Sequence, residues 1–332
     1  MKKLLFLRTC FALLLAFLAL SYAEASVTLN STNFPDNNFR AALEPYAQNG
    51  VIDETTLTTL DLSGVHNITN LKGLELLTRL TYLDISGNSG LTTGADLTGL
   101  TALTTLKASN CNLVTLAGIT GTSNITHVTG SGLTIGANNA NLISLDISNN
   151  PDFYASGNLQ HLTRLETLLL TNCTHYDGWI ATVGNALTKL KYLDASHCDL
   201  NFVSLSGPAT LEHFDVSYNT RLAGISTTAA SSTNHYIKLN SNCSNLKYVD
   251  VSYCTNMDRI FLYSATHLVH LNAAGTKIKG FSSNLSTSDA TQYYITLSNT
   301  LGNNGTLKYL NLSNCSNLDS LEHLPMHIMS HH

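Results

Sequence analysis

A nine-residue phrase recurs along most of this 332-residue chain and limits the folds that the chain can adopt. The phrase is apolar-x-x-apolar-x-apolar-Ser-x-(Asn or Cys), and clear copies start at Leu80, Leu142, Leu190 and Leu307. Seven further copies start at Leu57, Leu103, Ile125, Leu165, Leu211, Leu246 and Leu268, of which the copy at Ile125 is degenerate. Most starts lie 21 to 25 residues apart. One such unit cannot bury its apolar side alone, so neighbouring units must stack into a solenoid.

The phrase and its period resemble those of leucine-rich repeats. The resemblance implies an α/β horseshoe in which each apolar-x-apolar core is a short strand of a parallel sheet on the concave face. The rest of each repeat returns over the convex side, which we expect to be irregular or to carry short helices. The spacing of Trp179, Ile180, Val183, Leu187 and Leu190 predicts one such helical return.

Two segments precede the repeats. Residues 1–25 have the parts of a cleavable signal peptide: a basic start from Lys2 to Arg8, an apolar run over 10–20, and small residues at Ala23-Glu24-Ala25. An uncleaved membrane anchor is the alternative. Residues 26–56 are expected to form a cap, in which a turn and a short helix over 33–43 cover the open end of the first repeat. The sequence therefore predicts an exported protein, secreted or displayed at the cell surface.

The repeat domain is expected to span 57–320, followed by a tail at 321–332. Two repeats are long, with insertions at 223–245 and 279–306 that resemble each other. We expect these insertions to be mobile loops on the convex face. The alternative is that Tyr236–Leu239 and Tyr294–Leu297 form extra strands.

The repeats together with the opening Asn33-Phe34-Pro35-Asp36 and Phe39-Arg40 are similar to secreted bacterial leucine-rich repeat proteins of the Bacteroides surface-antigen and internalin-like types. The similarity covers residues 30 to about 320 and implies an adhesin-like role in binding molecules of a host or neighbouring cell. Relatives often carry an acidic, calcium-loop-like turn after the cap helix. The matching stretch here, residues 48–53, offers only Asn49 and Asp53 as side-chain ligands of that kind, which puts that site in doubt.

Composition excludes several classes of function. The net charge of −5 gives no basic footprint for nucleic acid. No metalloprotease, serine-hydrolase or phosphate-loop motif is present, so we expect no catalytic residues and no cofactor. His323, His327 and His331 have helical spacing for a metal, but Pro325 argues against a helix there, so no metal site is expected.

Six cysteines follow the signal segment, and five of them occupy the ninth position of the phrase, where other copies have Asn. Asn at such a position can satisfy backbone groups of the adjacent loop, and Cys can replace it as a small buried group with a weak S–H donor. Free structural thiols are the interpretation that this position favours. An even number of cysteines in an exported protein leaves disulfides open.

Outward-facing positions of the predicted strands carry the candidate binding site, because side chains alternate along a strand. One position is mostly Tyr or His from Tyr192 onward, the next is mostly Asp, and a Ser position follows. Tyr has a flat apolar face and a polar tip, which suits both sugars and protein hot spots. The predicted ligand-binding residues are Tyr192, His213, Tyr248, His270, Tyr218, Tyr253, Asp194, Asp215 and Asp250.

The sequence predicts a non-enzymatic protein that binds a protein or carbohydrate through its concave face. Two alternatives stay open. One is a structural spacer in a surface layer, for which the outward positions would have no ligand. The other is a hydrolase that uses a carboxylate pair on the same face, although a regular ladder of Asp residues is a poor match to the two separated carboxyls of a glycosidase.

Overall fold

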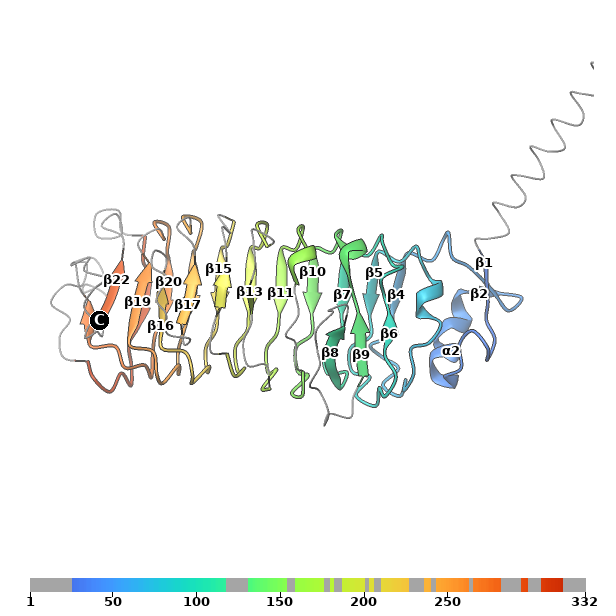
Figure 1. Cartoon of the computed structure of the whole chain (residues 1–332), viewed down its shortest axis with the longest axis horizontal. Helices are drawn as coiled ribbons and strands as arrows, with labels where there is room; N and C mark the ends of the chain where they lie inside the picture. The colour runs from blue at the N-terminus through green and yellow to red at the C-terminus, as the bar shows by residue number, and fades with distance from the viewer. Residues whose placement is uncertain are drawn as a thin grey trace, which may run out of the picture.

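The computed structural model describes residues 26–117, 131–153, 159–175, 180–181, 187–200, 203–205, 210–226, 236–239, 243–262, 265–281, 294–297 and 306–318. These residues form an elongated solenoid in which short strands lie side by side along the long axis (Figure 1). The expected signal peptide, the tail at 321–332 and the degenerate copy at Ile125 lie outside the described residues.

Ten parallel strands form the concave sheet. They are β4 (Thr59–Asp61), β5 (Tyr82–Asp84), β7 (Thr105–Lys107), β10 (Ser144–Asp146), β11 (Thr167–Leu169), β13 (Tyr192–Asp194), β15 (His213–Asp215), β18 (Tyr248–Asp250), β20 (His270–Asn272) and β23 (Tyr309–Asn311). Each strand is the core of one phrase, and equivalent phrase positions are paired, as in Tyr192 with His213. Because β7 pairs directly with β10, no strand lies between them, and the expected copy at Ile125 does not contribute one.

The apolar positions of the phrase form one continuous core. Leu83, Leu145, Leu193 and Val249 are fully buried, as the alternation along each strand predicts. Leu310, in β23, is only half-buried, because β23 is the last strand of the described sheet and no described repeat covers its outer side.

Asn and Cys at the ninth phrase position tie consecutive repeats together. Asn150 accepts hydrogen bonds from the backbone of Cys111 and Leu113, both at 2.9 Å, and donates to the carbonyl of Ala108 at 2.9 Å. Cys198 instead donates its S–H to the carbonyl of Leu170 at 3.1 Å. All six cysteines in the described residues are free, in agreement with the interpretation as structural thiols.

The N-terminal cap closes the open end of the first repeat. Helix α2 (Asn37–Leu43) is followed by a short 3-10 helix η1 (Glu44–Tyr46), and β1 (Ser26–Thr28), β3 (Val51–Asp53) and β2 (Ala47–Gln48) form a small antiparallel sheet. Phe34, Phe39 and Leu43 are fully buried, as expected. Asp36 caps α2 through Oδ1, and its Oδ2 accepts two hydrogen bonds from Thr69, both at 2.8 Å. One carboxylate therefore fixes both the helix and its attachment to the repeats.

The convex side carries strands where a helical return was expected. Its described residues include three short 3-10 helices, η2 (Leu74–Leu76), η3 (Ala137–Asn139) and η4 (Leu159–His161). The predicted helix that includes Ile180 and Leu187 is wrong at Ile180, which lies in β12 (Ile180–Ala181) and pairs with β14 (Val203–Leu205). Trp179 and Val183 lie outside the described residues. Pairing across repeats satisfies the backbone groups that an isolated helical turn would leave open.

Convex strands form one three-stranded and one seven-stranded parallel sheet. The three-stranded sheet has β6 (Ala95–Asp96), β9 (Ser131–Thr134) and β8 (Leu113–Ala117), and the other has β12, β14, β17 (Tyr236–Leu239), β16 (Gly224–Ser226), β19 (Arg259–Leu262), β22 (Tyr294–Leu297) and β21 (Gly280–Phe281). The interpretation of the insertions at 223–245 and 279–306 as loops is therefore wrong at β17 and β22, and the alternative, that these residues form extra strands, is confirmed. β17 lies between β14 and β16, β22 lies between β19 and β21, and β9 lies between β6 and β8. Each of these inserted strands thus separates the first convex strand of its own repeat from the first convex strand of the preceding repeat.

These inserted strands make the convex side longer than the concave side. Five repeats contribute the seven strands of the larger convex sheet but only β11, β13, β15, β18 and β20 to the concave sheet. Neighbouring strands lie roughly 4.8 Å apart, so the convex side is longer by about 10 Å over this stretch. The solenoid must therefore bend toward the concave sheet.

Candidate binding surface on the concave face

Five aromatic rings at the first outward position of successive strands form one continuous stack, here named the Tyr/His column: Tyr192, His213, Tyr248, His270 and Tyr309. Ring centroids of neighbouring members are 4.0 to 4.3 Å apart and ring planes are within 17° of parallel. In-register parallel pairing explains the stack, because it spaces equivalent side chains by roughly 4.8 Å, close to ring-stacking distance. The structure thus brings together the four predicted members and adds Tyr309.

A second stack, here named the turn column, consists of His197, Tyr218 and Tyr253 where β13, β15 and β18 end. Its centroid distances are 4.0 and 4.7 Å. All three residues have a left-handed backbone, with φ of 54°, 60° and 56°. The same position in six other repeats also has positive φ and carries only Gly or Asn: Gly87, Asn110, Asn149, Asn172, Gly275 and Asn314. A left-handed conformation costs roughly 1–2 kcal/mol for residues other than Gly and, in part, Asn, so this column retains aromatic rings against a local conformational cost.

Packing within the two columns leaves ring edges rather than ring faces toward solvent. His213 lies between Tyr192 and Tyr248, so both of its faces are covered. Tyr253 has Tyr218 on one side and Gly275 on the other, where a Cβ at 275 would be 2.8 Å from the ring. Tyr218 nevertheless remains 43% exposed and Tyr253 38% exposed. The expected flat faces for sugar stacking are therefore largely occupied within the columns.

Between the two columns lies an acidic column, Asp194, Asp215 and Asp250, at the third position of β13, β15 and β18. One oxygen of each carboxylate accepts a hydrogen bond from the backbone N–H of the Ser two residues later, at 2.8 to 3.0 Å. This bond fixes each carboxylate at the end of its strand. The second oxygen of Asp250 also accepts from the Tyr248 hydroxyl at 3.3 Å.

Burial and like charges perturb the titration of this surface. Desolvation raises the pKa of Asp215 to about 6. Hydrogen bonds from Ser217 oppose this shift, and the charges of Asp250 and Asp194 add to it. Desolvation also lowers the pKa of His213, which the carboxylates of Asp194 and Asp250 oppose. Above about pH 6 Asp215 is therefore mostly ionised, beside a His213 imidazole whose uncharged form burial favours.

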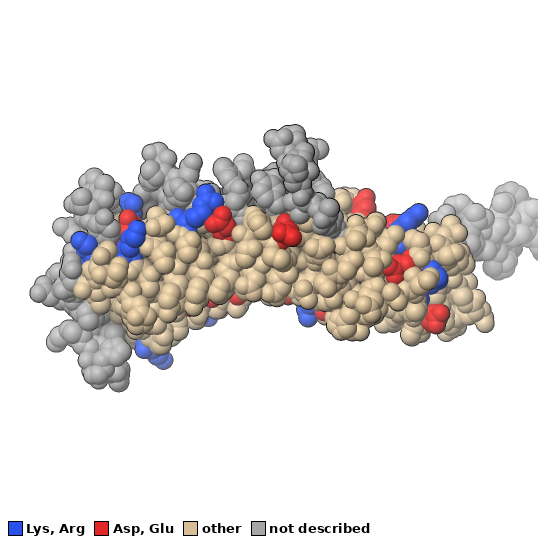
Figure 2. Space-filling view, turned by 90° about the horizontal axis from the view of Figure 1, so that it is seen from below, with Lys and Arg blue, Asp and Glu red and all other residues tan. Residues whose placement is uncertain are grey.

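The sequence already indicates the extent of both columns. The third phrase position reads Tyr82, His127, Tyr192, His213, Tyr248, His270 and Tyr309, and the eighth position includes His197, Tyr218 and Tyr253. Tyr309 and His197 were not among the predicted binding residues, and His127 lies outside the described residues. Over the face visible in Figure 2, charged side chains are scattered on a surface that is mostly uncharged, in agreement with the low charged fraction of 12%.

Two features are absent from the described residues. They contain no group of three or more His, Cys, Asp or Glu side chains that could hold a metal ion. None of their helices is long and apolar enough to cross a membrane. The histidines at 323, 327 and 331 lie outside the described part of the chain.

No protein-family model and no curated protein matches the chain. Among solved structures, an internalin of Listeria monocytogenes, InlF, is 17% identical, with 88% of this chain and 96% of that chain covered and a TM-score of 0.38. The functional domain of InlJ from Listeria monocytogenes is 20% identical, with coverage of 89% and 75% and a TM-score of 0.41. YopM from Yersinia enterocolitica is 18% identical, with coverage of 78% and 57% and a TM-score of 0.35. The repeated phrase, paired in register across ten parallel strands, makes this chain a leucine-rich repeat solenoid.

Proposed function

We propose that this protein is a non-enzymatic binding protein that recognises a partner protein through the Tyr/His and turn columns of its concave face. The observation that carries the proposal is the turn column: aromatic rings occupy a left-handed position where six other repeats have Gly or Asn. Residues held in such conformations cluster at functional sites, where the surrounding structure holds a side chain against its local cost. A structural spacer would need neither these rings nor their exposure.

A protein partner suits this surface better than a carbohydrate does. Sugars bind aromatic residues by lying on a ring face, and stacking covers the faces inside both columns. Ring edges with hydroxyl and imidazole tips, next to carboxylates, instead suit the mixed apolar and polar contacts of a protein interface. Tyr is among the residues that dominate binding energy at the centres of such interfaces.

The hydrolase alternative is supported by one observation and opposed by another. Asp215 has the raised pKa, about 6, that a general acid needs. However, Asp194 and Asp215 occupy paired positions of neighbouring parallel strands and project from the same side of one sheet. Two such carboxyls cannot flank opposite sides of a scissile bond, as the two carboxyls of a glycosidase must.

The proposed location is outside the cytoplasm, secreted or displayed at the cell surface. The support is the order of a basic start, an apolar run and small residues within 1–25. N-terminal sequencing of the exported protein should begin at Ser26, and a mature chain that begins at Met1 would contradict a cleaved signal.

The binding role is tested by screening the purified exported protein against immobilised extracellular matrix proteins and a glycan array, and by comparing two double variants. Tyr192→Ala with Tyr248→Ala should weaken binding to any partner found at least tenfold, since truncation of aromatic anchors typically costs about 2 kcal/mol or more. Thr59→Ala with Thr105→Ala changes the same strand position at the other end of the sheet and should leave binding unchanged.

Equal binding by the two double variants would exclude the concave columns as the site. The insertions at 223–245 and 279–306 would then be the next candidates. If a glycan binds the wild-type protein but not the Tyr192 and Tyr248 double variant, the ligand of the concave face is a carbohydrate and not a protein. Circular dichroism of each variant separates loss of the site from loss of the fold.

A further inference from the structure

Charged residues occupy two positions of the repeated phrase, and in this region only one of these positions forms ion pairs between described residues of neighbouring repeats. At the second phrase position, opposite charges alternate and pair across repeats: Lys191 with Glu166 at 2.8 Å, and Lys247 with Glu212 at 2.7 Å. At the acidic column three positions later, Asp194 and Asp215 are neighbours of like charge, and neither makes an ion pair with a described residue. The basic residues nearest in sequence are therefore engaged elsewhere.

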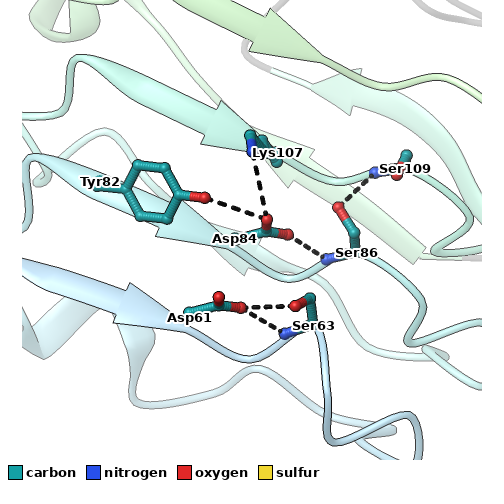
Figure 3. A network of polar contacts seen from close by, with 7 residues as sticks. All are labelled: Asp61, Ser63, Tyr82, Asp84, Ser86, Lys107 and Ser109. Carbon is teal, nitrogen blue, oxygen red and sulfur yellow. Dashed lines mark hydrogen bonds and ion pairs between the residues drawn. The ribbon is translucent and has the colours of Figure 1, made fainter.

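The other end of the same sheet shows how this position accommodates a cation. Lys107 occupies the acidic-column position in β7, one strand after Asp84, and its Nζ lies 3.8 Å from Asp84 Oδ2 (Figure 3). The same ammonium lies 5.5 Å from the centre of the Tyr82 ring, whose hydroxyl donates to Asp84 Oδ2 at 3.2 Å. A tyrosine, a carboxylate two residues later and an ammonium from the next repeat thus form one unit.

The first two parts of this unit recur in the acidic column without the third. Tyr248 donates to Asp250 Oδ2 at 3.3 Å, and Tyr192 and Asp194 have the same spacing in β13. Lys107 is the residue paired with Asp84 in the next strand. At the equivalent place, Asp215 is paired with Asp194 and Asn272 is paired with Asp250. Asn272 offers one neutral N–H donor to Asp250 at 2.9 Å, whereas Asp215 adds a further negative charge beside Asp194.

We propose that the partner presents Lys or Arg side chains on a segment that lies between the Tyr/His column and the turn column, with its cations on Asp194 and Asp215 in the place that Lys107 takes beside Asp84. This inference rests on the proposed binding function and specifies the chemistry of its ligand. Charge complementarity supports it, because a cation would relieve the repulsion between adjacent carboxylates roughly 4.8 Å apart. The aromatic columns would contact the apolar stems of the same basic side chains.

The probes are three fluorescein-labelled twelve-residue peptides in which Ser alternates with Lys, with Gln or with Glu. Fluorescence anisotropy with the purified exported protein at pH 8 and low salt should show binding of the lysine peptide, at least tenfold weaker binding of the glutamine peptide and none of the glutamate peptide. Binding of the lysine peptide should weaken as salt is raised, since exposed charges are screened beyond about 8 Å at physiological ionic strength.

Two variants of Asp215 locate the site. Asp215→Lys places an ammonium one strand after Tyr192 and Asp194, in the relation of Lys107 to Tyr82 and Asp84, and should reduce lysine-peptide binding at least tenfold. Asp215→Asn removes only the charge and should reduce binding three- to tenfold, which keeps the test valid if the lysine variant fails to fold. Asp146→Lys is the matched control in the same phrase position and should bind like the wild type.

The outcomes separate this inference from the binding function itself. Equal affinity for the lysine and glutamine peptides would overturn the basic ligand, as would unchanged binding by both Asp215 variants. If a partner protein still depends on Tyr192 and Tyr248 in either case, the concave binding function stands and only its charge preference is wrong. If the partner is insensitive to those tyrosines, the binding function fails first.

Discussion

Tyr192 and His213 are stacked with ring centroids 4.0 Å apart and ring planes 3° from parallel. His213 also stacks on Tyr248 at 4.1 Å, so one imidazole supports a tyrosine on each side. Each aromatic pair contributes about 0.5–1.5 kcal/mol beyond its area of burial. The Tyr/His column is therefore a cooperative surface, in which one ring sets the position of its neighbours.

Replacement of His213 by Ala should decrease the free energy of unfolding by about 1–2 kcal/mol, because both stacking contacts are lost. The same variant should weaken partner binding about as much as loss of Tyr192, since Tyr192 and Tyr248 would no longer be held. His213→Phe keeps the stack and should retain stability. Urea unfolding and partner titration measure both effects, with Thr167→Ala, at the same phrase position in β11, as the control. A His213→Ala variant as stable as the control would show that the stack contributes nothing.

The turn column predicts a difference between two substitutions that both remove a ring. Tyr218→Ala keeps a residue that disfavours the left-handed conformation, whereas Tyr218→Asn introduces a residue that tolerates it. The Asn variant should therefore be more stable than the Ala variant by about 1 kcal/mol. Thermal or urea unfolding compares the pair directly. At Tyr82, a strand position without positive φ, the Asn variant should not exceed the Ala variant, and the same order at both positions would argue against backbone strain at Tyr218.

The raised pKa of Asp215 predicts how stability depends on pH. A folded-state pKa of about 6 against an ordinary value of 3.8 means that Asp215 favours folding when protonated, and this contribution is lost as pH rises from about 4 through 6. Asp215→Asn should thus match the wild type near pH 4 and exceed its stability by about 1–3 kcal/mol at pH 8. His213, His270, Asp194 and Asp250 face Asp215 in both proteins, so their titration largely cancels in the comparison.

Asp61 is the control of opposite sign for the pH experiment. Hydrogen bonds from Ser63 lower the pKa of Asp61, so this exposed carboxylate favours folding when it is ionised. Asp61→Asn should therefore lose stability relative to the wild type at pH 8 and not at pH 3. An Asp215→Asn variant that is no more stable than the wild type at pH 8 would show that ionised Asp215 carries no cost.

The buried thiols predict slow chemical modification. Burial raises the pKa of Cys111, Cys173 and Cys243 to about 12, so almost no thiolate is present at neutral pH. Native protein should resist iodoacetamide, and denatured, unreduced protein should show six modified cysteines after residue 25. Disulfide-linked peptides in the mass spectrum would contradict the free state of these residues.

The concave half of the fold could be predicted from the sequence because one phrase determines both the strand and the direction of its side chains. Leu145 and Tyr192 are separated by two repeats, yet the phrase alone assigns one to the core and the other to the surface. The ring stacks could not be predicted, because they depend on side-chain rotamers that the register does not determine. The left-handed position did have a signal, since Asn149, Asn172 and Gly275 occupy it in other repeats.

The convex half could be predicted much less well. β17 and β22 coincide with Tyr236–Leu239 and Tyr294–Leu297, which the sequence offered only as an alternative to loops, and each pairs on one side with a strand of the preceding repeat. The apolar spacing around Ile180 fits a helix equally well as a short strand, because so few residues cannot distinguish the two periods. The copy at Ile125 lacked a clear phrase, and the direct pairing of β7 with β10 shows that the concave sheet omits it.

The inserted convex strands also impose an order on folding. β17 follows β16 in the chain, yet it lies between β14 and β16, so β14, which pairs with β12 on its other side, acquires its second partner only after residues beyond β16 are in place. The concave rows can form one after another as the chain emerges, as expected for a solenoid whose repeats contact only their neighbours. The convex strands cannot form in this order. β9, β17 and β22 follow β8, β16 and β21 in the chain, yet each must be placed on the side of that strand that faces the preceding repeat before the next repeat docks. Growth of this solenoid should therefore pause at three points, where the convex side must be completed out of sequence order.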